Sequence, residues 1–113
     1  MLTSEEMLRL LQVLACRARL EILATLAARG ELCTRDIADQ LPTPISYSLV
    51  CRHLVSLREL DLVSIDADVI DGRITTLYAL CRGRVEELVV ALRDLAFRGT
   101  PFVGFVSLDR LGG

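Results

Sequence analysis

The side chains best suited to chemistry in this chain gather in one stretch, from Ser46 to Leu57. On a helix, Val50, Leu54 and Leu57 fall at positions i, i+4 and i+7, so they form an apolar stripe that faces the core. The polar groups on the rest of the helix are those of Ser46, Tyr47, Ser48, Cys51 and Arg52. Hydroxyl and guanidinium groups bind phosphates and base edges, so the stretch fits a helix that enters a DNA major groove. An ordinary amphipathic core helix would carry the same stripe, and the flanking elements must decide between the two interpretations.

Four cysteines, Cys16, Cys33, Cys51 and Cys81, are the other groups with reactive chemistry. They are widely spaced and form no C-x-x-C motif, which favours a reduced cytoplasmic protein over a disulfide-stabilised secreted one. Cys51 shares the helix surface with Arg52, so its oxidation could switch DNA binding. The alternative is that each cysteine is simply a small buried hydrophobic side chain.

The one histidine of the chain gives no support for an enzyme. His53 lies two residues from Cys51, and side chains two apart on a helix point in roughly opposite directions. The two groups therefore cannot act as base and nucleophile within this helix. His53 flanks the apolar stripe and is interpreted as structural.

The composition points to one small domain that associates with itself. A chain of 113 residues has single-domain length, and 52% apolar residues is a high fraction for so small an interior. The excess predicts a subunit interface, most simply that of a homodimer. Charged residues interrupt every apolar run before the ~18 residues of a membrane span, and Glu5 and Glu6 stand where a signal peptide would be positive. We therefore expect a cytoplasmic protein that has no membrane partner.

The charge balance offers no general attraction to nucleic acid. The formal net charge is −2, so any contact with DNA must come from local groups. All 13 basic residues are arginines, which bind phosphate and guanine in a bidentate manner. A GC-rich coding sequence would give the same bias more simply, so the arginines alone do not indicate DNA binding.

Two helices are predicted at the start of the chain. Thr3-Ser4-Glu5-Glu6 matches a capping box and begins a helix that runs to about Ala15. A second helix is predicted from Ala18 to Ala28, with Gly30 placed to end it. Its apolar residues at helical spacing are Leu20, Leu23, Ala24 and Ala27.

A short helix and a turn precede the central stretch. Thr34 can cap a helix from Arg35 to Gln40, and Pro42-Thr43-Pro44 then forces a break. The helix that begins at Ser46 is predicted to run to about Leu60. A short helix, a turn and a second helix with an exposed polar face form the helix-turn-helix pattern.

A β-hairpin and a closing helix are predicted to follow. Apolar and polar residues alternate from Val63 to Val69 and from Ile74 to Leu80, on either side of an Asp71-Gly72 turn. The closing helix is predicted from Val85 to about Phe97, and its apolar stripe is broad enough to pack on its own core and on a partner.

The predicted fold class is mainly α with a small β-hairpin. About five helices and a two-stranded wing make a winged helix-turn-helix, and the expected assembly is a homodimer. Residues 1–98 would form the DNA-binding and dimerisation domain, and residues 99–113 an apolar C-terminal tail whose structure the pattern does not predict.

Three blocks of sequence, taken in order, match a known pattern. Leu14-Ala15 followed by Arg19-Leu20-Glu21-Ile22-Leu23 is the first, and Glu31-Leu32-Cys33-Thr34-Arg35-Asp36 is the second. The third runs from Ser46 to Leu57 and continues with Arg58-Glu59 and Leu62-Val63. Together they resemble the ArsR/SmtB family of small dimeric bacterial repressors, over roughly residues 5 to 97.

The resemblance implies a sequence-specific transcriptional repressor that leaves its operator when an effector binds. Two subunits would place their recognition helices in successive major grooves of double-stranded DNA, ~34 Å apart, and read an inverted repeat. The residues that fall where the family's DNA contacts cluster are Ser46, Tyr47, Ser48, Cys51 and Arg52, with Arg73 in the wing.

The chain departs from the family pattern around the recognition helix. The turn from Leu41 to Ile45 is longer by about two residues, so the helix is expected to be presented differently. Asp61 replaces the usual glycine after the helix, and Leu49 replaces a small or polar residue within it.

The wing departs from the family pattern in its charge. It carries three carboxylates and only one basic residue, namely Asp66, Asp68, Asp71 and Arg73. Carboxylates close to phosphates are repulsive, so deep insertion of the wing is not expected. The acidic wing and the high apolar content favour an alternative function, a winged-helix protein–protein interaction module with lost or weak DNA binding.

The effector that the family implies is a metal ion or a thiol oxidant. The best-known metal site of the family uses both cysteines of a C-x-C motif, but here only Cys33 remains because Arg35 takes the second place. The other family site lies on the closing helix, which has no histidine here, so a typical zinc site is not expected. Cys33 is the best single ligand for a soft metal or a metalloid such as arsenite, and Cys16 is the second effector candidate. A reactive sulfur or oxygen species could act on the thiols instead.

Overall fold

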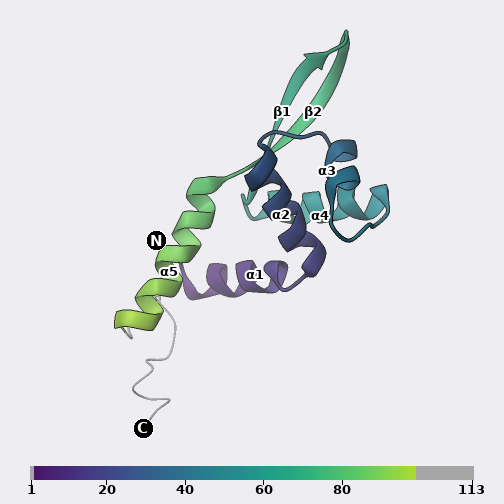
Figure 1. Cartoon of the computed structure of the whole chain (residues 1–113). Coiled ribbons are helices and arrows are strands. Elements are labelled where there is room, and N and C mark those ends of the chain that lie inside the picture. The colour runs from purple at the N-terminus through teal and green to yellow at the C-terminus, as the bar shows by residue number, and fades with distance from the viewer. Residues whose placement is uncertain (1, 99–113) are drawn as a thin grey trace. The chain divides into compact units, whose positions relative to one another are not determined.

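The computed structural model describes residues 2–98 of the chain. Within these residues it contains five helices and one antiparallel hairpin (Figure 1), as the sequence predicts. The elements are α1 (Ser4–Leu14), α2 (Arg17–Arg29), α3 (Thr34–Gln40), α4 (Tyr47–Glu59), β1 (Val63–Ile70), β2 (Arg73–Leu80) and α5 (Arg82–Arg98). The fold is a winged helix-turn-helix, in which α3 and α4 form the helix-turn-helix and the two strands form the wing. The predicted tail, residues 99–113, lies outside the described residues.

Two compact units make up the chain. The helix-turn-helix unit spans Val13–Cys81 and contains α2, α3, α4 and the wing. Within the described residues, the terminal unit consists of residues 2–12 and 82–98. Every residue that was predicted to contact DNA belongs to the helix-turn-helix unit.

In the terminal unit, α1 begins at a side-chain cap. The backbone N–H of Glu6 donates to Thr3 Oγ1, and the Thr3 hydroxyl donates to the Glu6 carboxylate, each at 3.2 Å. The predicted capping box is present, although Glu6 binds the cap hydroxyl rather than the cap N–H. Arg84 Nη1 lies 3.6 Å from Glu6 Oε2 and 3.2 Å from Glu87 Oε2. Among the side chains of this unit whose burial is described, the buried apolar ones are Leu2, Met7, Leu10, Leu88 and Ala91.

The core of the helix-turn-helix unit contains the stripe predicted for α4. Val50, Leu54 and Leu57 are each 0% exposed. They share this core with Ile22, Leu26, Ile37, Leu41, Leu60, Leu62 and Val63. Because α2 and α3 both pack against α4, burial of this stripe fixes which side of α4 faces solvent.

Two predictions about the other helices need correction. In α2, Ile22 and Leu26 are buried, whereas Leu20 from the predicted series is 51% exposed. Alanine and leucine residues occur on all sides of α2, so the periodicity of apolar residues alone could not show which side is buried. In α3, the helix already includes Thr34, and Cys33 is the N-cap without a side-chain hydrogen bond.

Positive backbone angles end α4 and turn the hairpin. Asp61 has a φ of 58°, its N–H donates to Arg58 O, and the next N–H donates to Leu57 O, both at 3.0 Å. This is the left-handed helix ending for which the family uses glycine, and aspartate tolerates it. In the wing, Asp71 and Gly72 have φ values of 52° and 76°, which confirms the predicted two-residue hairpin turn.

Candidate nucleic-acid interface

The N-terminus of α4 is capped as the sequence predicts. Ser46 is extended (φ −66°, ψ 152°), and its Oγ accepts the backbone N–H of Leu49 at 3.3 Å. A second hydroxyl, that of Ser48, lies 3.3 Å from Ser46 Oγ. The first turn therefore offers hydroxyls beside unpaired backbone N–H groups, an arrangement that favours a phosphate.

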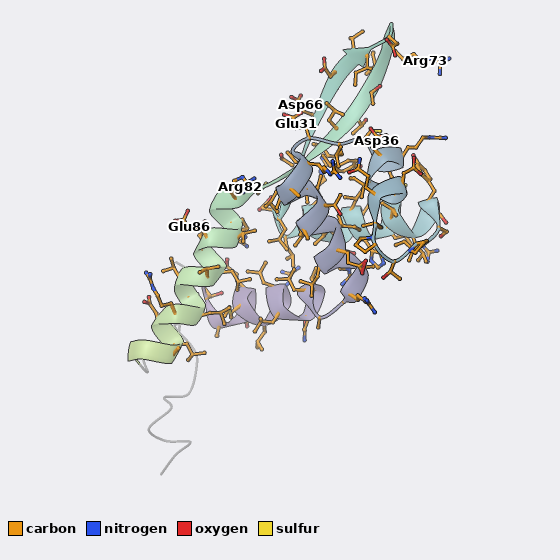
Figure 2. The ribbon with its side chains drawn as sticks, viewed as in Figure 1. Glu31, Asp36, Asp66, Arg73, Arg82 and Glu86 are labelled. Carbon is orange, nitrogen blue, oxygen red and sulfur yellow. The ribbon has the colours of Figure 1, made fainter. Side chains whose placement is uncertain are left out.

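The structure brings five of the six predicted DNA contacts together on α4. Ser46, Tyr47, Ser48 and Arg52 are exposed, and Cys51 is half-buried at the edge of the same surface. Arg73 lies separately, at the outer end of the wing, as Figure 2 shows. The exposed surface of α4 and the wing tip are thus two distinct places at which DNA could be contacted.

A hydrogen-bonded brace, which the sequence did not predict, connects α2 to α4. Arg19 Nε donates to His53 Nδ1 at 3.2 Å, and Arg19 Nη1 donates to the carbonyl oxygen of Val13 at 3.0 Å. Burial, and then the neighbouring Arg19 charge, lower the pKa of His53 below its ordinary value. The neutral imidazole accepts the guanidinium N–H, so His53 is structural, as interpreted from the sequence.

The stability of the helix-turn-helix unit is expected to fall as the pH decreases below about 6.5. His53 takes its ordinary pKa of 6.5 in the unfolded chain and a lower pKa in the folded chain. Between these two values the unfolded chain binds more protons, so acid favours unfolding, and this destabilisation is absent above pH 6.5. The midpoint of urea unfolding, measured from about pH 7.5 to about pH 5.5, should decrease accordingly.

His53→Gln is the matched control for this pH effect, because the chain has no other histidine. Glutamine keeps an oxygen that can accept from Arg19 but does not titrate. The decrease in the urea midpoint should be absent in this variant. If the variant retained the full decrease, other groups would be responsible for it.

A carboxylate on α2 holds the long turn that precedes α4. Glu21 Oε1 accepts the backbone N–H of Thr43 at 2.9 Å, and its side chain is only 15% exposed. Arg17 Nε lies 3.3 Å from Glu21 Oε2, but the geometry between them is not that of a hydrogen bond. The turn from Leu41 to Ile45 is therefore attached to α2, and this attachment sets how the chain enters α4.

Two of the wing carboxylates have a local structural role. Among residues 2–98, β1 pairs with β2 and with no other strand, so the backbone N–H groups on its other edge have no strand partner. Asp66 Oδ1 accepts the N–H of Ala67 at 2.9 Å, and Asp68 Oδ1 accepts the N–H of Val69 at 2.8 Å. These side chains satisfy edge donors and place negative charge there, which hinders a further strand from pairing with β1. Figure 2 shows Asp66 on the hairpin, well before the tip at Arg73.

The cysteines are free and half-buried. Cys16 and Cys33 are the N-cap residues of α2 and α3, Cys51 lies within α4, and Cys81 follows β2. Among residues 2–98, no three His, Cys, Asp or Glu side chains are grouped so that they could hold a metal ion. Cys33 therefore has no complete set of metal ligands in the described part of the chain.

A helix-turn-helix whose second helix, here α4, is capped and exposed, followed by a two-stranded wing, is typical of the class of winged helix-turn-helix DNA-binding regulators. Residues 16–64 match the model of the bacterial regulatory protein, arsR family. The match confirms, over these residues, the resemblance to the arsR family that the sequence shows. The helices of the described residues include none that is both long and apolar enough to cross a membrane.

Several solved structures share the winged helix-turn-helix fold of this chain. An ArsR-like transcriptional regulator from Rhodococcus sp. RHA1 has a TM-score of 0.66 and 19% identity, covering 83% of this chain and 82% of that one. The reduced form of the transcriptional regulator YodB from B. subtilis has a TM-score of 0.63 and 18% identity, covering 86% and 91%. Bacillus subtilis PadR in complex with operator DNA has a TM-score of 0.53 and 19% identity, covering 82% and 54%. No curated protein sequence matches the chain significantly.

Proposed function

We propose that this protein is a dimeric, sequence-specific transcriptional repressor that reads an inverted-repeat operator with α4. The observation that carries the proposal is the surface of α4, where a capped N-terminus and the exposed Arg52 lie opposite a fully buried stripe. The net charge of −2 provides no general attraction, so these local groups must supply the affinity for DNA.

The exposed apolar surface of the terminal unit supports the homodimer. Among the side chains described there, the large apolar ones that are at least 39% exposed include Leu8, Leu11, Val89, Val90 and Leu92. They lie on α1 and α5, and such a set is more favourable when another subunit covers it. A dimer would supply the two α4 helices that an inverted repeat requires.

Selection from a randomised pool of DNA duplexes tests the function. The enriched sequence should be an inverted repeat with half-sites about 10 base pairs apart, and two chains should bind each duplex. The affinity should fall steeply with added salt, because phosphate contacts release counterions. An interaction module without DNA binding would enrich no sequence and show no salt-sensitive affinity.

We further propose that thiol chemistry releases the repressor from DNA. Cys51 lies next to Arg52 on α4, at the edge of the surface proposed to contact DNA, and Cys16 and Cys33 are the N-cap residues of α2 and α3. Oxidation of two thiols to a disulfide would transfer two electrons and two protons to a peroxide, and a metalloid would instead bind the thiolates.

The effector experiment separates these two routes. The complex with the selected duplex is titrated with hydrogen peroxide and, separately, with arsenite. Release by one reagent and not the other would identify the route, and replacement of Cys16, Cys33, Cys51 and Cys81 by serine should abolish it. If this fourfold variant still releases DNA normally, the thiol proposal is wrong.

Removing two wing charges is expected to strengthen DNA binding. In a variant with Asp66→Asn and Asp68→Asn, the side-chain oxygens can still accept the N–H groups of the β1 edge, but the repulsion of phosphates is lost. At about 10 Å each unit charge contributes about 0.4 kcal/mol in water, so the affinity should rise about two- to fourfold at low salt. Binding isotherms at low and at higher salt measure the effect, which screening should reduce.

Glu5→Gln is the control for the wing variant. It removes one exposed carboxylate from α1, in the terminal unit, and should leave the affinity nearly unchanged. An equal gain per carboxylate removed would mean that net charge, rather than the position of the wing, determines the affinity.

A further inference from the structure

A hollow on α4 combines cationic and apolar groups. It has a volume of about 510 Å³ and is lined by Arg19, Leu49, Arg52, His53, Val55 and Ser56, all within the helix-turn-helix unit. Two of the lining side chains are large, apolar and exposed: Leu49 is 40% exposed and Val55 is 57% exposed. Neither residue belongs to the buried stripe on the opposite side of α4, so packing of the core does not explain why they are apolar.

The position of Leu49 places it among the groups that would meet DNA bases. It is the third residue of α4, in the half of a recognition helix that contacts base edges. Arg52 follows three residues later, so the two side chains are neighbours on the helix surface. The N–H of Leu49 donates to Ser46 Oγ, so the N-cap holds its backbone in place.

The chemistry of the hollow fits duplex DNA as its occupant. Arg52 can bind guanine O6 and N7 in a bidentate manner, and the guanidinium groups favour a polyanion over a purely apolar partner. In the major groove, the apolar group that base pairs present is the C5-methyl of thymine. An exposed leucine beside an exposed arginine therefore matches a thymine beside a guanine.

We propose that Leu49 is a specificity-determining residue that contacts the methyl group of a thymine next to the guanine bound by Arg52. The proposal rests on the proposed function, because it requires α4 to lie in the major groove. The proposal also accounts for leucine at position 49, where the arsR-like pattern has a small or polar residue.

Uracil substitution tests the methyl contact. In the duplex selected from the randomised pool, each thymine is replaced singly by uracil, which lacks only the methyl group. With the full chain, uracil at one position in each half-site should weaken binding about fourfold, the effect expected from burial of one methyl group. For Leu49→Ala, thymine and uracil at that position should bind equally well.

Val55→Ala is the matched control, since it also removes an exposed apolar side chain from the hollow. It should retain the fourfold uracil effect, as wild type does. Leu49→Gln provides a second variant that should lose the effect if Leu49→Ala does not fold.

The outcomes distinguish this proposal from the proposed function. Salt-sensitive binding to a selected sequence, without any uracil effect, would overturn the role of Leu49 and leave the repressor function standing. A uracil effect that persists in Leu49→Ala, or that disappears in Val55→Ala, would also overturn it. Failure to select any sequence, with no salt-sensitive binding, would overturn both proposals.

Discussion

Replacing Arg52 with alanine is expected to weaken binding to the selected duplex by about 5- to 150-fold. The estimate corresponds to about 1–3 kcal/mol for a bidentate contact between arginine and guanine. Within residues 2–98 the structure gives the exposed Arg52 guanidinium no carboxylate partner, so DNA would not have to displace an ion pair. Fluorescence anisotropy with the labelled duplex, at one fixed salt concentration, measures the change.

Two further variants separate the geometry of Arg52 from its charge. Arg52→Lys keeps the positive charge but loses the planar fork, so it should recover little of the preference for guanine. Arg29→Ala removes the same charge from the last turn of α2 and should change the affinity only slightly. Equal losses for Arg29→Ala and Arg52→Ala would contradict a specific role for Arg52.

The features that the sequence predicted correctly are those set by neighbouring residues. The apolar stripe of α4 and the Ser46 cap depend on residues within one or two helical turns. The Asp71-Gly72 turn depends on two residues that accept positive φ. Because these features are local, residue type and spacing were sufficient to predict them.

The contacts that position α4 could not be predicted in this way. His53 is 34 residues from Arg19, and Thr43 is 22 residues from Glu21. These residues come into contact only when α2, α3 and α4 pack together, so their spacing in the sequence does not predict the contacts. Glu21 looked like one residue of a family block, yet it holds the longer turn through a backbone N–H.

The wing carboxylates have a second role that residue type alone did not indicate. They were interpreted only as groups that repel DNA, which remains the reason for the expected gain in the Asp66 and Asp68 variant. The structure adds that both side chains bind N–H groups at the free edge of β1. Protection of this edge accounts for acidic residues on a wing without requiring that DNA binding has been lost.

Leu54→Ala is expected to lower the free energy of unfolding by about 2–5 kcal/mol. Leu54 is 0% exposed in the core of the helix-turn-helix unit, so the truncation removes buried apolar contacts and leaves a cavity. A loss of this size is a large part of the ~5–15 kcal/mol that stabilises a typical domain. Urea unfolding followed by circular dichroism measures it.

The adjacent Val55 is the internal control for this prediction. It is 57% exposed, so Val55→Ala should change the free energy of unfolding by no more than about 0.5 kcal/mol. The two neighbouring side chains therefore differ in role: Leu54 packs α4 into the core, whereas Val55 lies on its exposed surface. A loss below about 1 kcal/mol for Leu54→Ala, or a larger loss for Val55→Ala, would contradict this orientation of α4. The assignment of its opposite surface to DNA would then have to be abandoned as well.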